Sequence, residues 1–475
     1  MSDNSGLPLP GVNILVKGTT TGTQTDFDGN YSINAQTGDV LSFTYIGLKA
    51  QEVTVGTSNT VNVTMEEDAA VLDEVIVTAI GIKRERRETS YVTESVDSEE
   101  LLTVQPQSAA SALAGKVAGL QINVQDNGVR PNTQILLRGL RSITQSNSAL
   151  IVIDGSISTQ GAFDQLNPND IESLTTLKGA TAAALYGSRA ANGALLVTTK
   201  TGKRGDRFTI GINSSYTMEQ VAYMPDFQTQ YGSGWQGVYD PYENTNWGPR
   251  FDGVIRRVGP IFADGSYQTL PYAPVEDNLK DFYDTGGSSN NTVYFSGSDD
   301  NNKYYVSIGK LETEGIVPDD KYTRNSFRVN ASRKMGNLEL GFTSSYTTDK
   351  SSLVGGTIGS QDRPLYWFIL NTSANIPLKN YRNWQTDLYA SPDGWYNAYY
   401  QNPYWAIDTN RDNDKSSRLV ANISADWEAT NWLNLTGRFG VNTISAIGKE
   451  WRDAQAYLPN SSYLVTAGRP DPVSS

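Results

Sequence analysis

The sequence of 475 residues contains no cysteine and no histidine. Their absence excludes a cysteine nucleophile, a serine–histidine nucleophile, a histidine general base, and zinc or iron sites built from these two residue types. It also excludes disulfide bonds, so cysteine usage says nothing about the compartment in which the chain folds.

The sequence also lacks long apolar runs and an excess of basic residues. No run of about 18 apolar residues occurs, which excludes a transmembrane helix but not transmembrane β-strands, whose alternating residues average out as polar. The net charge is −13, which argues against nucleic acid as a partner because phosphate binding needs a basic face. The first residues lack a basic and then apolar start, so no signal peptide is expected in this copy.

Residues 1–66 are predicted to form a small β-sandwich. The segment 26–30 contains an Asp-Gly pair typical of a tight turn, and a calcium loop is disfavoured because further ligands do not follow. Strand-forming runs recur at sandwich-like spacing. They are residues 11–16, 31–33, 40–45 and 61–65.

Residues 67–90 are predicted to be an exposed linker. It holds one strand-forming segment, Leu72-Asp-Glu-Val-Ile-Val-Thr-Ala79, between an acidic start and the basic run Lys83-Arg-Glu-Arg-Arg87. The alternative is an ordinary edge strand of a neighbouring domain, and the segment alone does not decide between the two. Residues 91–204 then mix short helices and strands and are predicted to be one α/β domain.

From residue 205 to 475 the apolar residues alternate with period two, which predicts β-strands. We expect seven strands, at about 206–218, 290–298, 303–311, 325–332, 338–348, 417–428 and 432–444. Tight turns at 299–302, 333–337 and 429–431 contrast with long connections at 219–289 and 349–416. Short turns on one side and long loops on the other favour an outer-membrane barrel over a soluble sandwich.

Several separate strings carry a resemblance to a known family. The most specific is Asn167-Pro-Asn-Asp-Ile-Glu-Ser173, followed by 177–182 and by Leu185-Tyr-Gly-Ser-Arg-Ala-Ala-Asn-Gly193. Others are residues 72–79, 113–120, 137–142 and 246–253. Together they resemble SusC-type (SusC/RagA) TonB-dependent outer-membrane transporters of Bacteroidetes.

This resemblance implies a mainly β chain with four parts. Residues 1–66 would be a carboxypeptidase-regulatory-like β-sandwich, 67–90 a linker with the TonB box, 91–204 an α/β plug domain, and 205–475 part of a transmembrane antiparallel β-barrel. Two departures stand out. Plugged barrels of this kind have about 22 strands, and Pro8-Leu-Pro10 comes so early that the first sandwich strand is expected to be absent. The chain resembles an N-terminal fragment, which alone is not expected to insert and transport.

The implied function is TonB-dependent import of oligosaccharides, or of peptides, across the bacterial outer membrane together with a SusD-like lipoprotein. It implies no catalytic residue, no cofactor and no metal, so the chain is not expected to be an enzyme. TonB would bind the box by β-strand addition, in which main-chain hydrogen bonds supply the affinity. The box residues are Asp73, Glu74, Val75, Ile76, Val77 and Thr78.

The resemblance also suggests contact residues inside the barrel. Charged plug residues could form ion pairs with the barrel wall, although each could equally be solvated surface charge. They are Arg138, Arg141, Glu172, Lys178 and Arg189. Aromatic residues of the long loops could stack on sugar rings, although Tyr and Trp also form girdles at membrane interfaces. The candidates are Trp235, Trp247, Tyr366, Trp367 and Trp395.

Three alternatives stay open at this point. The first is an importer of siderophores or corrinoids, and the second is a receptor that also signals. The third is a secreted β-rich glycan-binding or glycoside-hydrolysing protein that uses paired carboxylates. A pair such as Glu312 and Glu314 is weak support for the third alternative, because acidic residues are frequent throughout the chain.

Overall fold

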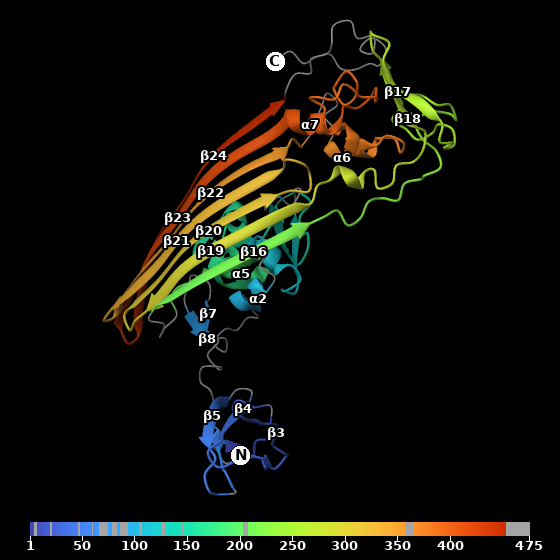
Figure 1. The fold of residues 1–475 in the computed structure, drawn as a ribbon. Helices are drawn as coiled ribbons and strands as arrows, with labels where there is room; N and C mark the ends of the chain where they lie inside the picture. The colour runs from blue at the N-terminus through green and yellow to red at the C-terminus, as the bar shows by residue number, and fades with distance from the viewer. Residues whose placement is uncertain are drawn as a thin grey trace. The chain divides into compact units, whose positions relative to one another are not determined.

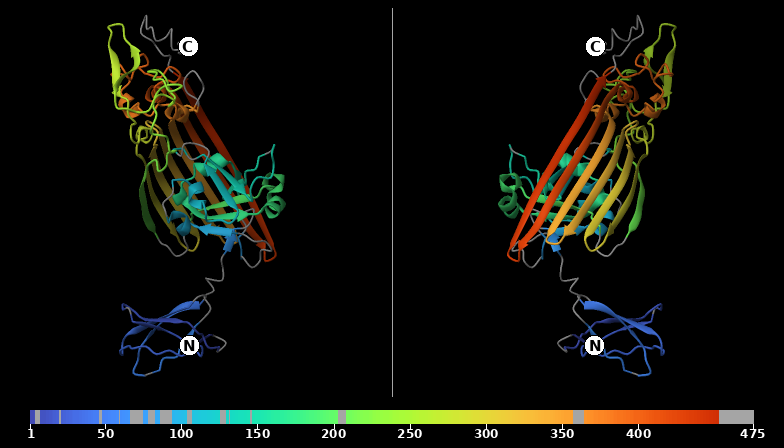
Figure 2. Two further views of the ribbon diagram at one scale, coloured as in Figure 1. Left: turned by 90° about the vertical axis from the view of Figure 1, so that its right-hand side faces the viewer. Right: turned by 90° about the vertical axis from the view of Figure 1, so that its left-hand side faces the viewer.

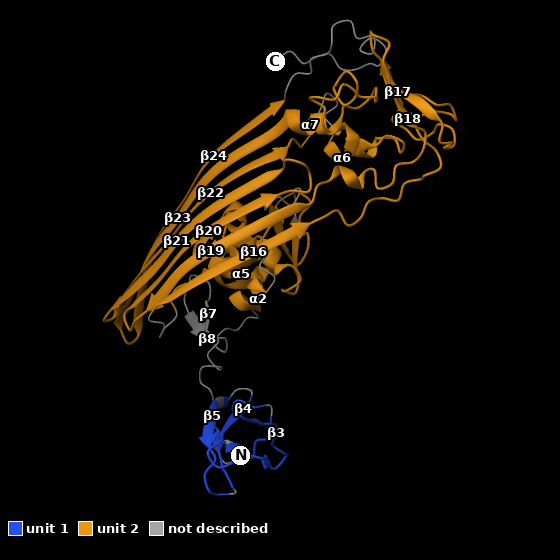
Figure 3. Cartoon of the chain, viewed as in Figure 1, with its two compact units in different colours: residues 1–92 blue, residues 93–475 orange. Residues whose placement is uncertain are grey.

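The chain forms two compact units in the computed structural model, residues 1–92 and 93–475 (Figure 3). The described residues are 1–3, 7–19, 21–45, 48–58, 60–65, 75–77, 83–85, 94–103, 107–124, 129–130, 132–144, 146–202, 208–356 and 364–452. Among them, no helix combines the length and the apolar character needed to cross a membrane.

The first unit is a small β-sandwich. Its main sheet has the order β3-β2-β4-β5, formed by Gly22–Gln24, Asn13–Val16, Val40–Tyr45 and Leu48–Thr54. The buried core that holds the two layers together consists of Val12, Ile14, Val16, Leu41, Phe43, Val63 and Met65.

Two local features of this unit bear on the sequence analysis. The turn after β3 is organised by the Asp26 side chain, whose Oδ1 accepts from the backbone N–H groups of Asp28 (3.0 Å) and Asn30 (2.7 Å). A strand also precedes the early prolines, because β1 (Ser2–Asp3) pairs in parallel with β6 (Thr64–Met65). The sequence analysis did not expect a strand at that position.

The predicted strand in the linker is present as backbone structure. Strand β7 (Val75–Val77) pairs antiparallel with β8 (Lys83–Glu85), with Ile76 opposite Arg84. The remaining residues predicted for the TonB box, Asp73, Glu74 and Thr78, lie outside the described residues.

The second unit begins with a mixed α/β domain. Its five-stranded sheet has the order β13-β12-β15-β14-β9, and β12 and β15 run parallel. In that order the strands are Ser156–Ser158, Leu150–Ile153, Ala194–Thr199, Ile171–Leu177 and Glu94–Asp97. A hairpin of β10 and β11 and short helical segments pack around this sheet. They are Leu120–Val124, Thr133–Leu137, α2 (Ser98–Leu102), α3 (Ala109–Leu113), α4 (Gln160–Asp164), η3 (Pro168–Asp170), α5 (Gly179–Tyr186) and η4 (Gly187–Ala190).

The rest of the second unit is dominated by one antiparallel sheet that lies against the α/β domain (Figures 1 and 2). It has the predicted seven strands, in the order β16-β19-β20-β21-β22-β23-β24. They are Thr209–Glu219, Gly286–Ser298, Asn302–Glu314, Lys321–Met335, Leu338–Val354, Asn410–Thr430 and Leu433–Arg452. All seven strands overlap the segments predicted from the sequence, although most extend several residues beyond the expected bounds.

Because successive side chains of a strand point to opposite faces, the period-two alternation gives the two faces of this sheet different side chains. One transverse row pairs Ile308 with Phe327, Phe327 with Tyr346, and Tyr346 with Leu419. All four side chains are exposed. The neighbouring row pairs Ser307 with Arg328, and both side chains are buried toward the α/β domain. An apolar outer face and a polar inner face are the pattern of a barrel wall in a membrane.

The long connections are folded rather than extended. The hairpin β17 (Ile255–Ile261) and β18 (Tyr267–Pro271) belongs to this region, together with η5 (Lys280–Phe282), α6 (Leu365–Leu370), η6 (Leu378–Tyr381) and α7 (Pro403–Thr409). They share an aromatic core. Its largest members are Phe282, Phe368, Tyr381, Trp395, Tyr396, Tyr404 and Trp405.

Substitution of Trp395 tests this loop core. Its ring lies edge-on to Tyr381 and Tyr396, with centroids 4.9 Å apart in both pairs, and its Nε1 donates to the Tyr400 carbonyl at 2.7 Å. Trp395→Ala should therefore cost about 3–5 kcal/mol of local stability, measured as faster proteolysis of the loops. The matched control is Trp247→Ala, because Trp247 is 69% exposed. Equal proteolysis of the two variants would contradict the assignment of Trp395 to the core.

Candidate functional site at the interface between the α/β domain and the seven-stranded sheet

The interface is organised around one tight turn, η3, which the string at 167–173 encodes. Asn167 caps this turn, and its Oδ1 accepts from the backbone N–H of Asn169 at 3.1 Å. Pro168 suits the first position because no helical hydrogen bond is needed from its nitrogen. The side chains of Asn167, Asn169 and Asp170 are all buried. Buried polar side chains need hydrogen-bond partners, and here the sheet supplies them.

Both asparagines of the turn donate to strand β19. Asn167 Nδ2 lies 2.9 Å and Asn169 Nδ2 3.2 Å from the Thr292 hydroxyl. Strand β20 makes room for this contact with Gly309, where an added Cβ would lie 2.5 Å from Asn167 Nδ2. A side chain at 309 would therefore displace the Asn167 amide from this contact.

Asp170 connects the turn to the middle of the sheet. Its Oδ1 accepts from the Tyr305 hydroxyl at 3.0 Å and from the Ser307 hydroxyl at 2.6 Å. Its Oδ2 lies 3.6 Å from Nε of Arg328, a buried arginine on β21. The same guanidinium reaches Asp154, with Nη1 at 3.4 Å from Oδ2. Two carboxylates from separate turns of the α/β domain thus enclose one buried cation of the sheet.

Asp154 is itself held in place by strand β15. It accepts from the Thr199 backbone N–H at 2.9 Å and from the Thr199 hydroxyl at 2.8 Å. The sheet contacts the same point, because Asn330 Nδ2 donates to the Thr199 hydroxyl at 2.8 Å and to the Lys200 carbonyl at 2.7 Å. The carboxylate is therefore oriented before Arg328 approaches it.

A second cluster lies beside the first, around Gln165. Its Nε2 donates to Asp349 on β22 at 3.0 Å, and its Oε1 accepts from Nε of Arg418 on β23 at 2.8 Å. Arg418 also donates to the Thr159 hydroxyl at 3.3 Å and to the Asn442 side chain at 3.2 Å. Amide and charged groups again form the contact.

The rim of the interface adds an ion pair and a small apolar contact. Nη1 of Arg130 lies 2.7 Å from Oδ2 of Asp414. Beside it, the buried Val129 packs on a small apolar patch of the sheet. The patch consists of Leu311, Tyr322 and Leu353. A cavity of about 120 Å³, lined in part by Asp154, Lys303 and Arg438, also lies between the two layers. The contact as a whole is rich in hydrogen bonds and poor in apolar packing.

Family models match the first two parts of the chain. Residues 1–77 match the CarboxypepD_reg-like domain, and residues 85–194 match the TonB-dependent receptor plug domain. The TonB-dependent receptor SusC of Bacteroides thetaiotaomicron is 30% identical over 451 residues, which are 90% of this chain and 42% of that receptor. The TonB-dependent receptor P26 of Formosa agariphila is 32% identical over 490 residues, with coverages of 93% and 45%.

The chain belongs to the SusC-type TonB-dependent receptors. It spans less than half the length of the curated relatives described above. The α/β domain is therefore the plug, and the seven strands are wall strands of the outer-membrane barrel of this family. The relatives are receptors and not enzymes.

A solved structure supports the same fold. The RagAB peptide importer in its open–open state superposes with a TM-score of 0.59 at 21% identity. The superposition covers 82% of this chain and 44% of the RagAB chain. At this level of identity the similarity bears on the fold alone.

The five charged residues predicted to join plug and wall are placed elsewhere in the SusC-type plug. Lys178 pairs with Glu94 of the plug at 3.0 Å, and Arg141 donates to the Ala191 carbonyl of the plug at 3.1 Å. Arg138, Glu172 and Arg189 are exposed. Among the described residues none of the five forms an ion pair with the seven strands, so their role as barrel contacts stays a prediction.

The residues that do join plug and wall are not among the five that the sequence suggested. Three of them, Asn167, Asn169 and Asp170, lie inside the string used to recognise the family. A cluster of short polar residues directly before a strand was the available signal. Polar side chains in that position either cap a turn or are buried, and here they do both.

The predicted loop aromatics divide into two groups. Trp235, Trp247, Tyr366 and Trp367 are 55%, 69%, 48% and 40% exposed, so they remain candidates for ligand contact. Trp395 requires a correction, because it is 1% exposed and belongs to the loop core. An indole buried on all sides cannot stack on a ligand.

The loops also enclose a cavity of about 500 Å³ that the sequence analysis did not identify. Its lining includes the exposed aromatic side chains of Tyr223 and Phe227 and the charged side chains of Asp226, Glu276 and Lys280. Nearby in the loops, burial raises the pKa of Tyr239 to about 12. Its neutral phenol donates to the Arg257 carbonyl at 2.6 Å.

Substitution of Asp170 tests the interface. Asp170→Asn removes one carboxylate from the buried Arg328 and should lower stability by about 3 kcal/mol, seen as release of the plug at lower urea concentration in pulse proteolysis. Glu172→Gln changes an exposed carboxylate two residues away and should stay within about 0.5 kcal/mol of the parent. Indistinguishable urea midpoints for the two variants would show that Asp170 does not fasten the plug.

The pair of Glu94 and Lys178 makes plug stability depend on pH. The hydrogen bond from Lys178 holds the Glu94 pKa below its usual 4.5. The pair therefore stabilises the plug above pH 4.5, and the contribution is lost as the pH falls through the lower pKa of the folded state. Lys178→Met should remove this part of the pH dependence at a cost below about 1 kcal/mol. Urea unfolding at several pH values checks it. A parallel pH profile for the parent and the variant would exclude the pair as the cause.

Proposed function

We propose that this chain supplies the plug and part of the wall of an active importer for oligosaccharides, or for peptides, in the bacterial outer membrane. The work would come from TonB, and a SusD-like lipoprotein would cover the outer side. The observation that carries the proposal is the polar contact between plug and strands, centred on Asp170, Asp154 and Arg328.

A polar contact suits a plug that must move under force. Each hydrogen bond across the interface contributes only about 1 kcal/mol net, because water replaces the partner when the bond opens. An apolar interface would lose about 25 cal/mol for every Å² exposed, with no such replacement. The exceptions are two buried guanidinium groups of β21, which hold the resting position because a buried charge cannot be left without partners. They belong to Arg328 and to Arg324, whose Nη1 donates to the Leu166 carbonyl of the plug at 3.3 Å.

The coupling to TonB is proposed to run through β7. Val75, Ile76 and Val77 are β-branched residues with a strong strand preference. A strand of three such residues offers main-chain groups along its edge, which is the basis of strand addition. Strand β7 pairs with β8 along one edge. Among the described strands none pairs with its other edge, and TonB is proposed to bind there.

The cargo is assigned from the chemistry of the loops. Exposed aromatic rings such as Trp235 and Trp247 offer flat apolar faces, which suit sugar rings and aromatic peptide side chains. The two residues lie together in one loop, since the Trp247 backbone N–H donates to the Gly234 carbonyl at 3.2 Å. A peptide cargo is the second choice, and RagAB is such a peptide importer.

A proline in β7 tests the TonB connection. Ile76→Pro removes a main-chain donor and should reduce TonB binding by at least about tenfold, measured with purified receptor and the periplasmic part of TonB. Arg87→Pro introduces the same residue outside the box and should leave binding unchanged. Binding that survives Ile76→Pro would refute the assignment of the box.

Loop tryptophans test the cargo. Removing Trp235 and Trp247 together should lower the uptake of a labelled oligosaccharide by at least about tenfold if each ring contributes 1 kcal/mol or more, roughly the value of an aromatic contact. Trp432→Ala is the matched control, because Trp432 is 83% exposed in the tight turn between β23 and β24. If oligosaccharide uptake were unchanged and peptide uptake reduced, the cargo would be assigned as a peptide instead.

A further inference from the structure

The outer face of the seven-stranded sheet changes character toward the long loops. On β22 and β23 its last exposed apolar row pairs Tyr346 with Leu419. Four residues farther along both strands, Lys350 lies directly opposite Lys415, and both lysines are exposed. Residues four apart in a strand share a face, so the two lysines lie on the outer face together with Tyr346 and Leu419.

The surroundings of the two lysines contain no counter-charge. On the neighbouring strands, Lys350 faces Thr323 and Lys415 faces Ile447. The flanking rows on their own strands are neutral and polar. They are Thr348 with Ser417 and Ser352 with Asn413. Among the described residues neither Lys350 nor Lys415 forms an ion pair, whereas Lys310 on the same face pairs with Glu312 at 2.7 Å.

The arrangement of Lys350 and Lys415 favours an external anion. The Cβ atoms of directly opposite residues in an antiparallel pair lie only about 5 Å apart, and like charges in such a pair destabilise the sheet. Lys449 adds a third positive charge, because it pairs with Asn413 and so lies diagonally across from Lys415. An anion bound between Lys350 and Lys415 removes the repulsion, and lysine is a common phosphate binder.

The height of the two lysines matches the polar headgroup layer of a membrane. Long loops lie on the outer side of an outer-membrane barrel and short turns on the periplasmic side. Four residues span about 14 Å of strand, which at a tilt of about 45° places the two lysines about 10 Å above the row of Tyr346 and Leu419. Lysine side chains bend toward a membrane interface, so the ammonium groups reach the headgroup layer, which is about 5–8 Å thick.

We propose that Lys350 and Lys415 form a binding site for a phosphate group of a lipid in the outer leaflet of the membrane. The phosphate lies between the two ammonium groups and supplies their missing counter-charge. The acyl chains of the lipid lie along the apolar rows that begin at Tyr346 and Leu419. The site lies on the outside of the wall, so it does not depend on the proposed import function.

Lipid binding to the purified receptor in a neutral detergent tests the proposal. The probe is diphosphoryl lipid A, and the matched probe is the same lipid without its phosphates. Lys350→Gln combined with Lys415→Gln should weaken binding of the diphosphoryl lipid by at least about tenfold, and should leave binding of the phosphate-free lipid unchanged. Added salt should weaken binding to the parent, because exposed charges are screened. Thermophoresis of the labelled receptor gives these affinities.

Two further double variants serve as controls. Lys350→Arg combined with Lys415→Arg keeps both charges and should retain the affinity of the parent, which separates a charge effect from misfolding. Lys17→Gln combined with Lys334→Gln removes two exposed charges elsewhere and should not weaken binding. Lys17 belongs to the first unit, and Lys334 lies at the opposite end of β21 from the long loops.

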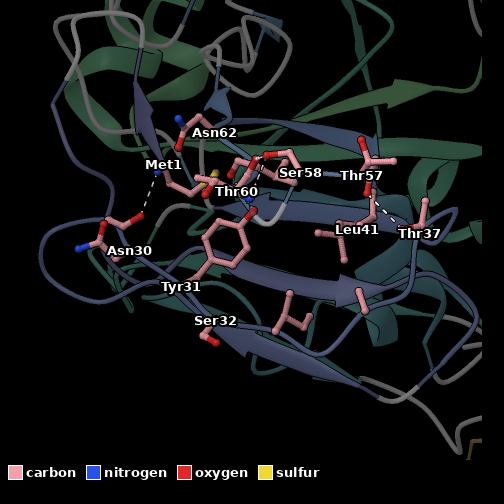
Figure 4. A pocket seen from close by; sticks show the side chains of 16 residues that line it. Met1, Asn30, Tyr31, Ser32, Thr37, Leu41, Thr57, Ser58, Thr60 and Asn62 are labelled. Atoms are coloured by element: carbon pink, nitrogen blue, oxygen red, sulfur yellow. Dashed lines mark hydrogen bonds between the residues drawn. The ribbon is translucent and has the colours of Figure 1, made fainter.

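A lipid could also be held in a cavity of about 480 Å³ in the first unit. Figure 4 shows this cavity among labelled side chains that include Tyr31, Leu41 and Thr60. No charged side chain lines it, so a lipid bound there would be insensitive to removal of its phosphates. Thr60→Trp places a large ring in the cavity and should leave binding of diphosphoryl lipid A unchanged.

Three results would overturn the proposal. The first is equal affinity of the parent for the diphosphoryl and the phosphate-free lipid. The second is parent-like affinity of the double glutamine variant, or a loss of affinity in the double arginine variant that equals the loss in the glutamine variant. The third is competition by inorganic phosphate at the same concentration as the lipid, since the two lysines would then bind free phosphate and not a lipid headgroup.

Discussion

The position of the plug depends on Arg328, a cation buried between two carboxylates. Removing a guanidinium from water costs several kcal/mol, and only well-placed opposite charges and hydrogen bonds offset that cost. Here the opposite charges, Asp154 and Asp170, lie on two turns of the plug, while Arg328 lies on β21. The plug and the sheet therefore have to be in register with each other. A shift of β21 by one residue would turn Arg328 to the outer face and leave both carboxylates buried without it.

The same constraint explains the polar character of the inner face of the sheet. Outward rows such as Ile308, Phe327 and Tyr346 are apolar because they face the membrane, whereas inward positions carry Thr292, Ser307 and Asn330. Each of these three side chains has a hydrogen-bond partner on the plug. The wall and the plug are thus joined by directional bonds that water can replace one at a time. The long loops are instead held together by apolar contacts, because they share an aromatic core around Trp395.

Main-chain pairing is a second kind of contact that this chain can make. Strand β7 in the linker pairs with β8 along one edge. A partner strand on the other edge would need no particular side chain. Its affinity would come from backbone hydrogen bonds, and its specificity from which side chains fit the alternate positions.

The sequence alone was enough for the parts that depend on local pattern. The alternation around Leu419, Ile423 and Trp427, and the tight turns between strands, predicted the seven strands, because side-chain direction in a strand has a strict period of two. The strings at 167–173 and 185–193 indicated the family because a run of this length and composition has a negligible chance of occurring in an unrelated protein.

Only the tertiary structure decided which residues meet. Charge suggested Lys178 and Arg141 as links to the wall, but both make their bonds within the plug, because the nearest partner of a long side chain depends on the fold and not on its charge. Short polar side chains, such as those of Asn167 and Asp170, do form links to the wall. They are so short that only groups packed directly against them can be their partners. The same holds for Trp395, whose sequence context is that of a loop but whose position is the centre of a core.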